Sequence, residues 1–263
     1  MSPESSRAQS VEACASFRTL ELAAKVAFDT RALAGAAARA TASAHEGQSV
    51  SISMPGVGEG DGWYRYAWHV WWAVPLLWRD DLAGPYGDLI VTIVRPDVSL
   101  SYVSFQQTLY TSEMTGAGER HPSAFGTVPM QLDTINDRLI EFPLIRSRLP
   151  TSDWQIAPLR HESYLLRPAR RIHATRRADV PRPWDPRVSG FWEGVDEYEC
   201  VIDDELGIFL GVTGVMDSTV VGTISVENLT VDAQIPSGTF DFSPPADTRV
   251  TLAVGKNKDN SMI

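Results

Sequence analysis

The residues from 198 to 245 decide the fold. They read YECVID (198–203), an acidic turn, GIFLGV (207–212), a second turn, VGTISVENLTVD (221–232) and IPSGTFDFSPP (235–245). The first three segments are β-patterned runs joined by short polar turns, which is the pattern of an antiparallel meander. In the fourth, Phe240 and Phe242 alternate on one face, and the double proline that follows stops further ladder pairing. We therefore predict a final strand that closes the edge of an open, curved sheet.

Composition favours one domain with an acidic surface. The chain has 263 residues, of which 43% are hydrophobic and eight are Trp, and this is ample for a core. No internal repeat or shift in composition marks a boundary, so we predict a single domain over residues 1–263. The net charge of −10 argues against a nucleic-acid binder or a protein that adheres to anionic membranes, because both classes are usually basic.

The remaining patterns predict a mainly β (α+β) architecture. An Ala-rich stretch with interspersed Leu and charges of both signs predicts an N-terminal helix over residues 11–46. The sheet is expected over residues 63–252, with a helical insert at about 132–149 where apolar residues recur every three or four positions. Residues 253–263 read as a frayed tail. Further β-patterned runs cover residues 88–95, 98–111 and 164–177.

Residues 63–78 form the most aromatic part of the chain and predict a long strand. Strand alternation puts the larger apolar set on one side: Tyr64, Tyr66, Trp68, Val70, Trp72 and Val74. The other side carries Trp63, Arg65, Ala67, His69 and Trp71. Two interpretations are open, because such a strand can be central with both faces covered, or it can line a ligand cavity.

The C-terminal third resembles a known family. The segments DEYECVIDDELGIFLGVTGV (196–215) and TISVENLTVDAQIPSGTFDFSPPADTRV (223–250) are similar to the end of the outer-membrane lipoprotein carrier (LolA-type) family and its actinobacterial relatives. The upstream segment HATRRADVPRPWDPR (173–187) resembles the strand before the meander in the actinobacterial members. The resemblance implies an unclosed half-barrel whose concave face is covered by helices. It also implies a hollow that binds acyl chains, and related sheets serve as sensor domains.

Two functional hypotheses follow. The first is a non-enzymatic binding protein that holds an apolar or acyl-chain ligand in a hydrophobic hollow by burial of its apolar surface. The residues expected to line this hollow are Trp68, Val70, Trp72, Val74, Leu139, Phe142 and Ile145. The alternative is a regulatory, sensor-type interaction domain whose hollow is filled by its own helices.

An arginine-rich run supplies the second candidate site. On a strand, Arg167, Arg171, His173 and Arg177 would share one face. They could form an anion-recognition stripe for a lipid headgroup or an acidic protein partner. They could equally form a solvent face whose cations pair with the acidic remainder of the chain.

No segment of the sequence contains a motif that identifies a reaction or a cofactor site. The five His share no metal-ligand spacing, and no P-loop, GxGxxG or GxSxG motif is present. Cys14 and Cys200 are far apart in the chain and are expected to pack as small apolar residues. The acidic run 203–205 is expected to be a hairpin turn rather than a catalytic carboxylate pair. We therefore expect a protein that is not an enzyme and carries neither metal nor cofactor.

The N-terminal residues suggest a location. They contain no secretory apolar core, and no run approaches the ~20 apolar residues of a membrane span. The sequence as written predicts a cytoplasmic protein. A start further upstream would allow a location in the cell envelope.

Overall fold

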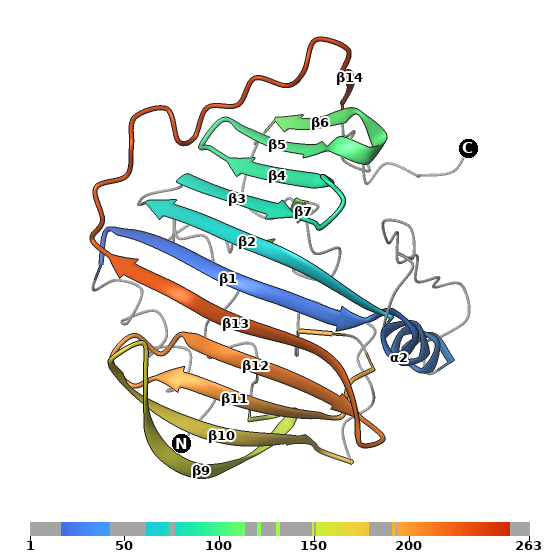
Figure 1. Ribbon diagram of the computed structural model, residues 1–263, viewed down its shortest axis with the longest axis vertical. Helices are drawn as coiled ribbons and strands as arrows, with labels where there is room; N and C mark the ends of the chain where they lie inside the picture. The colour runs from blue at the N-terminus through green and yellow to red at the C-terminus, as the bar shows by residue number, and fades with distance from the viewer. Residues whose placement is uncertain are drawn as a thin grey trace, which may run out of the picture.

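One twelve-stranded sheet dominates the computed structural model (Figure 1). The structure describes residues 17–42, 62–73, 77–113, 120–121, 130–131, 149, 151–178, 191–192 and 194–252. In order across the sheet, the strands are β14 (Arg249–Leu252), β6 (Thr108–Glu113), β5 (Val98–Val103), β4 (Leu89–Val94), β3 (Leu77–Ala83), β2 (Trp63–Ala73), β1 (Thr19–Asp29), β13 (Thr219–Val231), β12 (Phe209–Met216), β11 (Glu197–Asp203), β10 (Arg167–Arg176) and β9 (Trp154–Tyr164). The short strands β7 (Arg120–His121) and β8 (Met130–Gln131) form a separate pair.

The sheet is open. Neighbouring strands are antiparallel, except that β14 runs parallel to β6. The edge strands β14 and β9 lie at opposite ends of the sheet and do not pair with each other (Figure 1). The prediction of a mainly β protein with an unclosed sheet is confirmed, and so is the meander, which forms β11, β12 and β13.

The N-terminal segment differs from the prediction. Among the described residues of the helix expected over 11–46, residues 30–42 are helical, as α2 (Thr30–Ala42), whereas residues 19–29 form the central strand β1. Alternate residues of β1 are buried, and the strand pairs with both β2 and β13. Two ladders and a buried face outweigh the helix propensity of Ala. The carboxylate of Asp29 then accepts the N–H groups of Arg31 and Ala32 at 2.9 Å each, which caps the start of α2.

The other expected strands are present with changed boundaries. The aromatic run 63–78 contains β2 and the start of β3, and the run 88–95 contains β4. The run 98–111 is interrupted by the 3-10 turn η1 (Ser104–Gln106), after which Gln107 has a left-handed φ of 48°. The run 164–177 contains β10, but the preceding strand β9 was not predicted.

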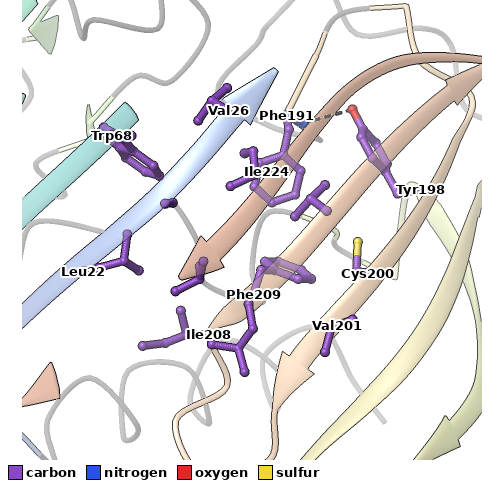
Figure 2. Packing of buried hydrophobic residues seen from close by; sticks show 14 of the residues in the cluster. Leu22, Val26, Trp68, Phe191, Tyr198, Cys200, Val201, Ile208, Phe209 and Ile224 are labelled. Atoms are coloured by element: carbon purple, nitrogen blue, oxygen red, sulfur yellow. Dashed lines mark hydrogen bonds between the residues drawn. The ribbon is translucent and has the colours of Figure 1, made fainter. Parts of the chain in front are cut away.

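One side of the sheet carries the main hydrophobic core, and we call it the core face. It is the side of Trp68, Val70 and Trp72 in β2, all of which are buried. Ladder partners continue the core across β1, β13, β12 and β11, and Figure 2 shows part of it: Leu22, Val26, Ile224, Phe209 and Cys200. The larger apolar side of the aromatic strand therefore faces the core, as the alternation predicts.

Helical cover is confirmed only in part. Among the described residues α2 is the one α-helix, and it lies at the end of β1 (Figure 1). It packs against β13 and β1 and adds Leu33 and Ala36 to the core. The helical insert expected at 132–149 lies outside the described residues apart from Leu149. Within the described part of the chain, no helix has the length and apolar character needed to cross a membrane.

The C-terminal aromatic pair has a different role from the one predicted. Residues 233–248 form no strand, and they run from β13 to β14 past the ends of the strands between them (Figure 1). Phe240 and Phe242 pack against a second cluster, on the face opposite the core face, and the rings of Tyr102 and Phe242 lie 5.3 Å apart. Ladder pairing then resumes at β14, so the expectation that the double proline ends it is wrong.

Arg79 explains why this segment needs no ladder. Its guanidinium donates to the carbonyl oxygens of Thr239 at 2.8 Å and of Asp241 at 3.4 Å. It is held in place by a bidentate pair with Asp81, with both distances 2.8 Å. Backbone groups that would otherwise require a strand partner are thereby satisfied.

Candidate ligand-binding site

A hollow of about 180 Å³ lies on the core face between β9 and β12. Its lining residues are Leu149, Ile156, Pro158, Arg170, Ile172, Ile202 and Phe209. Six of the seven are apolar, and Arg170 is the one charged residue among them. As far as the described residues form it, the hollow is therefore an apolar space with a single cation in its wall.

The lining follows from strand register. Ile172 of β10 lies opposite Pro158 of β9, and Arg170 lies opposite Ile202 of β11. Ile202 in turn lies opposite Phe209 of β12. Because side chains alternate between the faces of a sheet, these five residues project from the same side.

Two β-bulges adjoin the hollow. The ladder between β9 and β10 shifts register at Arg171/Ile172, and the ladder between β11 and β12 shifts at Val201/Ile202. A bulge bends the strand and increases its local twist. The two shifts therefore curve this end of the sheet beside the hollow.

The wall at Phe209 is supported from beneath. Phe209 is fully buried and meets the ring of Phe191 edge to face, with centroids 5.3 Å apart. Phe191 is held by Tyr198, whose hydroxyl accepts the N–H group of Phe191 at 3.0 Å (Figure 2). The same hydroxyl accepts the N–H group of Trp192 and donates to the carbonyl of Trp192, both at 3.0 Å. Burial raises the pKa of Tyr198 above its usual range, so the hydroxyl keeps the proton that it donates.

A pair of glycines fixes the position of Trp192. Gly214 and Gly222 lie opposite each other in the ladder between β12 and β13. A Cβ at either position would lie 2.8 Å from the Trp192 indole. The absence of a side chain at these two positions lets the indole lie directly on the sheet, which holds the segment that supports Phe209.

Arg170 and His161 both contact the carboxylate of Asp204. Its Nε lies 3.5 Å from one oxygen of Asp204, and its side chain is 34% exposed. Nδ1 of His161 lies 3.5 Å from the other oxygen of Asp204. Both contacts are long, so Arg170 retains donors for a further anion.

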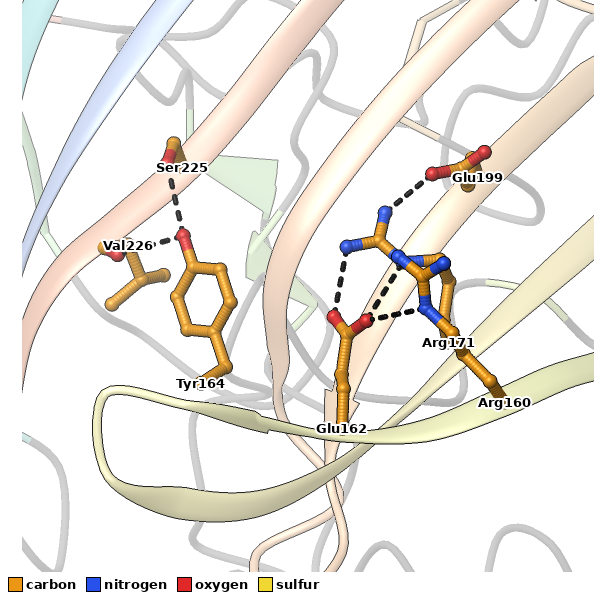
Figure 3. Close-up of polar contacts among 7 residues, drawn as sticks. All are labelled: Arg160, Glu162, Tyr164, Arg171, Glu199, Ser225 and Val226. Atoms are coloured by element: carbon orange, nitrogen blue, oxygen red, sulfur yellow. Dashed lines mark hydrogen bonds and ion pairs between the residues drawn. The ribbon is translucent and has the colours of Figure 1, made fainter.

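Three of the predicted anion-contact residues pair with acids of the chain. Arg167 pairs with Asp203 and Glu205, Arg171 with Glu162 and Glu199, and His173 with Glu197. Figure 3 shows the network around Arg171, which lowers the pKa of Glu162. Arg177 donates its backbone N–H to Asp153. This arrangement matches the interpretation of internal pairing, and binding of an outside anion by these residues stays a prediction.

Three of the predicted hollow residues lie elsewhere on the core face. Trp68, Val70 and Trp72 are packed in the core on β2, and the strands β1 and β13 separate β2 from the hollow. Val74, Leu139, Phe142 and Ile145 lie outside the described residues. A part for the aromatic strand in ligand binding stays a prediction.

A carboxylate is buried among these Trp residues. Asp80 of β3 is only 3% exposed and accepts hydrogen bonds from the indoles of Trp68 at 3.2 Å and Trp78 at 3.0 Å. Burial raises the pKa of Asp80 from 3.8 to about 6, and the indole hydrogen bonds offset part of this shift. Asp80 therefore titrates close to neutral pH.

Comparisons with known proteins give structural likenesses. No family model and no curated sequence matches the chain. An uncharacterized conserved protein from Thermus thermophilus is similar with a TM-score of 0.47 and 9% identity, over 94% of this chain and 99% of the other. MucA/MucB of Pseudomonas aeruginosa gives a TM-score of 0.44 and 10% identity, over 89% of this chain and 61% of the other. A putative outer membrane lipoprotein-sorting protein domain from Vibrio parahaemolyticus gives a TM-score of 0.33 and 7% identity, over 91% and 97%. A lipoprotein-sorting domain is thus among the similar structures.

The described residues contain few groups suited to catalysis. Among them, no three His, Cys, Asp or Glu residues are grouped so as to hold a metal ion. Cys200 is fully buried, and burial raises the pKa of its thiol, which keeps it protonated and unreactive. Asp203 accepts the N–H groups of Glu205 and Leu206 at 2.9 and 2.8 Å, so the acidic run is a hairpin turn as predicted. The absence of enzymatic activity stays a prediction.

Sequence reasoning did not predict the described residues that line the hollow. Ile156 and Pro158 belong to β9, whose sequence QIAPLRHES has no clear alternation. Ile202 and Phe209 carried a usable signal, because they flank the turn of a meander that the sequence does predict. Pairing across that turn would have put both on one face.

Proposed function

We propose that the chain is a non-enzymatic binding protein that holds an apolar group, such as the end of an acyl chain, in the hollow between β9 and β12. The observation that carries the proposal is an apolar space of about 180 Å³ with one cation, Arg170, in its wall. Apolar protein cavities of ~150 Å³ accept ligands the size of benzene. The hollow therefore suits a segment of about six carbons rather than a whole lipid.

The ligand class follows from the lining. Burial of a methylene group is worth ~0.8 kcal/mol, so six of them supply about 5 kcal/mol, which corresponds to a submillimolar dissociation constant. Arg170 favours a carboxylate or phosphate at the head of the chain, because a guanidinium binds such groups with two donors. The favoured ligand is an anionic amphiphile.

A filling variant and a matched control test the proposal. Ile172→Phe places a larger side chain in the hollow, whereas Thr175→Phe adds the same ring to the exposed, opposite side of the same strand. Uptake of a fluorescent fatty acid should be lost in Ile172→Phe and retained in Thr175→Phe, with circular dichroism confirming that both are folded. No uptake by the wild type, or equal uptake by both variants, would refute the proposal.

The alternative is a regulatory interaction domain whose hollow face is filled by its own chain. The burial of Trp68, Val70 and Trp72 supports it, since these side chains are packed in the core of the chain itself. Mass spectrometry of material extracted from purified protein separates the two. A bound amphiphile supports the carrier, and a ligand-free protein that also takes up no fatty acid favours the interaction domain.

A further inference from the structure

The hairpin between β9 and β10 ends in two leucines with unusual backbone angles. Tyr164 pairs with Arg167, so Leu165 and Leu166 form a two-residue loop. Their φ values are 51° and 60°, which is the left-handed region that a type I′ turn requires at both positions. Asn and Gly suit these positions, whereas a branched apolar residue is strained there. We call this pair the leucine tip.

A second hairpin in the same sheet has polar residues at both turn positions. Asp217 and Ser218 connect β12 to β13 with φ values of 48° and 63°, so the same turn is built there from polar residues. Leu166 by contrast is 100% exposed, and Leu165 is 37% exposed. Neither turn geometry nor burial within this chain accounts for leucine at the tip, and exposed apolar side chains of this kind mark contact sites.

The leucine tip is held firmly. The hydroxyl of Tyr164 lies 2.9 Å from Oγ of Ser225 and donates to the carbonyl of Val226 at 3.1 Å, so the hairpin is tied to β13 (Figure 3). Behind the tip, Arg167 binds Asp203 and Glu205. The strained turn is thereby presented in one conformation, and a contact made by the leucines would cost little further ordering.

The charges around the tip are balanced. Four of the five arginines of the hairpin lie against acids: Arg160 and Arg171 against Glu162, Arg167 against Asp203 and Glu205, and Arg170 against Asp204. These four arginines face four acids, so this part of the surface carries no net positive charge that would attract an anionic membrane. Two leucines, with Leu159 at 53% exposure on the same hairpin, also expose far less than the roughly 800 Å² that each partner buries in a stable protein complex.

We propose that the leucine tip docks on an uncharged lipid surface by inserting Leu165 and Leu166 among the lipid chains. A lipid layer deforms around a small convex apolar tip, whereas a protein partner would need a matching pocket and a larger surrounding contact. The balanced charges and the acidic chain favour neutral over anionic lipid. This contact is separate from ligand binding in the hollow, although β9 and β10 contribute to both.

Vesicle partitioning tests the proposal. Wild-type protein should sediment with phosphatidylcholine vesicles, and the partition coefficient should change little with salt. The variant Leu165→Asn/Leu166→Gly has the preferred I′ turn sequence, and its partition coefficient should be lower by about tenfold or more, because two leucines no longer enter the lipid. The control Ser218→Gly changes the matching position of the other turn and should bind as the wild type does.

Four outcomes would overturn the proposal. The first is the absence of wild-type binding to phosphatidylcholine, and the second is equal binding by the double variant. The third is binding that requires anionic lipid and disappears with salt. The fourth is a lipid-free dimer that the double variant abolishes. These experiments distinguish this proposal from the proposed function. The double variant should still take up fatty acid, and Ile172→Phe should still bind vesicles.

Discussion

The buried carboxylate of Asp80 leads to a prediction about stability that runs against the usual effect of acid. Asp80 lies on the core face, where it accepts two indole hydrogen bonds and has no cation among the causes of its shift. Thr92 lies opposite it in the ladder to β4. In Asp80→Asn the side-chain oxygen can still accept an indole N–H, and the new amide can donate to the Thr92 hydroxyl.

The magnitude follows from the pKa. Folding raises the pKa of Asp80 from 3.8 to about 6, so the folded state binds the proton more tightly than the unfolded state. Ionised Asp80 therefore lowers the free energy of unfolding by about 3 kcal/mol above pH 6. This cost is relieved as the pH falls toward 3.8, and about half of it is regained by pH 5. Asp80→Asn should abolish this gain and raise the stability at pH 7 by up to about 3 kcal/mol, less the loss of charge-assisted hydrogen bonds.

Urea denaturation followed by Trp fluorescence at pH 7 and pH 5 measures the effect. The difference between Asp80→Asn and the wild type should shrink by about 1–2 kcal/mol on going from pH 7 to pH 5. The control Asp247→Asn removes a charge from an exposed position and should keep the wild-type dependence. The reasoning is wrong if Asp80→Asn is less stable than the wild type at pH 7 and shows the same dependence of stability on pH. That result would mean that the two indole hydrogen bonds offset the whole cost of burying the ionised carboxylate.

Three further outcomes are expected. Gly222→Ala should lower the free energy of unfolding by ~1–3 kcal/mol because the new methyl group meets the Trp192 ring at 2.8 Å; in urea, Gly211→Ala, whose methyl group makes ordinary 3.6 Å contacts, should cost clearly less. Leu166→Gly should raise the stability by roughly 1 kcal/mol because it relieves a left-handed leucine; a lower melting temperature would contradict this. Cys200 should react with a thiol reagent only as fast as the protein unfolds, because its thiol is buried with a raised pKa; rapid reaction in native buffer would show an open path to it.

The strands that sequence predicts best are those whose partners are close in the chain. β11, β12 and β13 are joined by short polar turns, so local alternation and turn chemistry suffice to predict them. β1 pairs instead with residues that are distant in the chain, such as Ile224 opposite Val26. Its Ala-rich sequence favours a helix locally, and the partners that make it a strand cannot be seen from the segment alone.

The aromatic pair of the C-terminal segment shows a second limit. Alternation placed Phe240 and Phe242 on one side correctly, and they do contact a single cluster. What the sequence could not show is that Arg79, some 160 residues away, satisfies the backbone carbonyls of this segment. With those groups satisfied, the segment packs by its side chains and needs no ladder of its own.

The hollow could not be predicted from the sequence for a related reason, and this reason also bears on the function of the hollow. The core face is filled where large rings occupy it, as Trp68, Trp72 and Trp78 do on β2 and β3. The described lining of the hollow is mainly aliphatic, with Pro158 and Phe209, and the two register shifts bend the strands there. Aliphatic side chains on a bent part of the sheet leave volume at this point. The meander that predicts the fold thus also supplies walls of the hollow, through Ile202 and Phe209, whereas the aromatic strand β2 contributes Trp68, Val70 and Trp72 to the core.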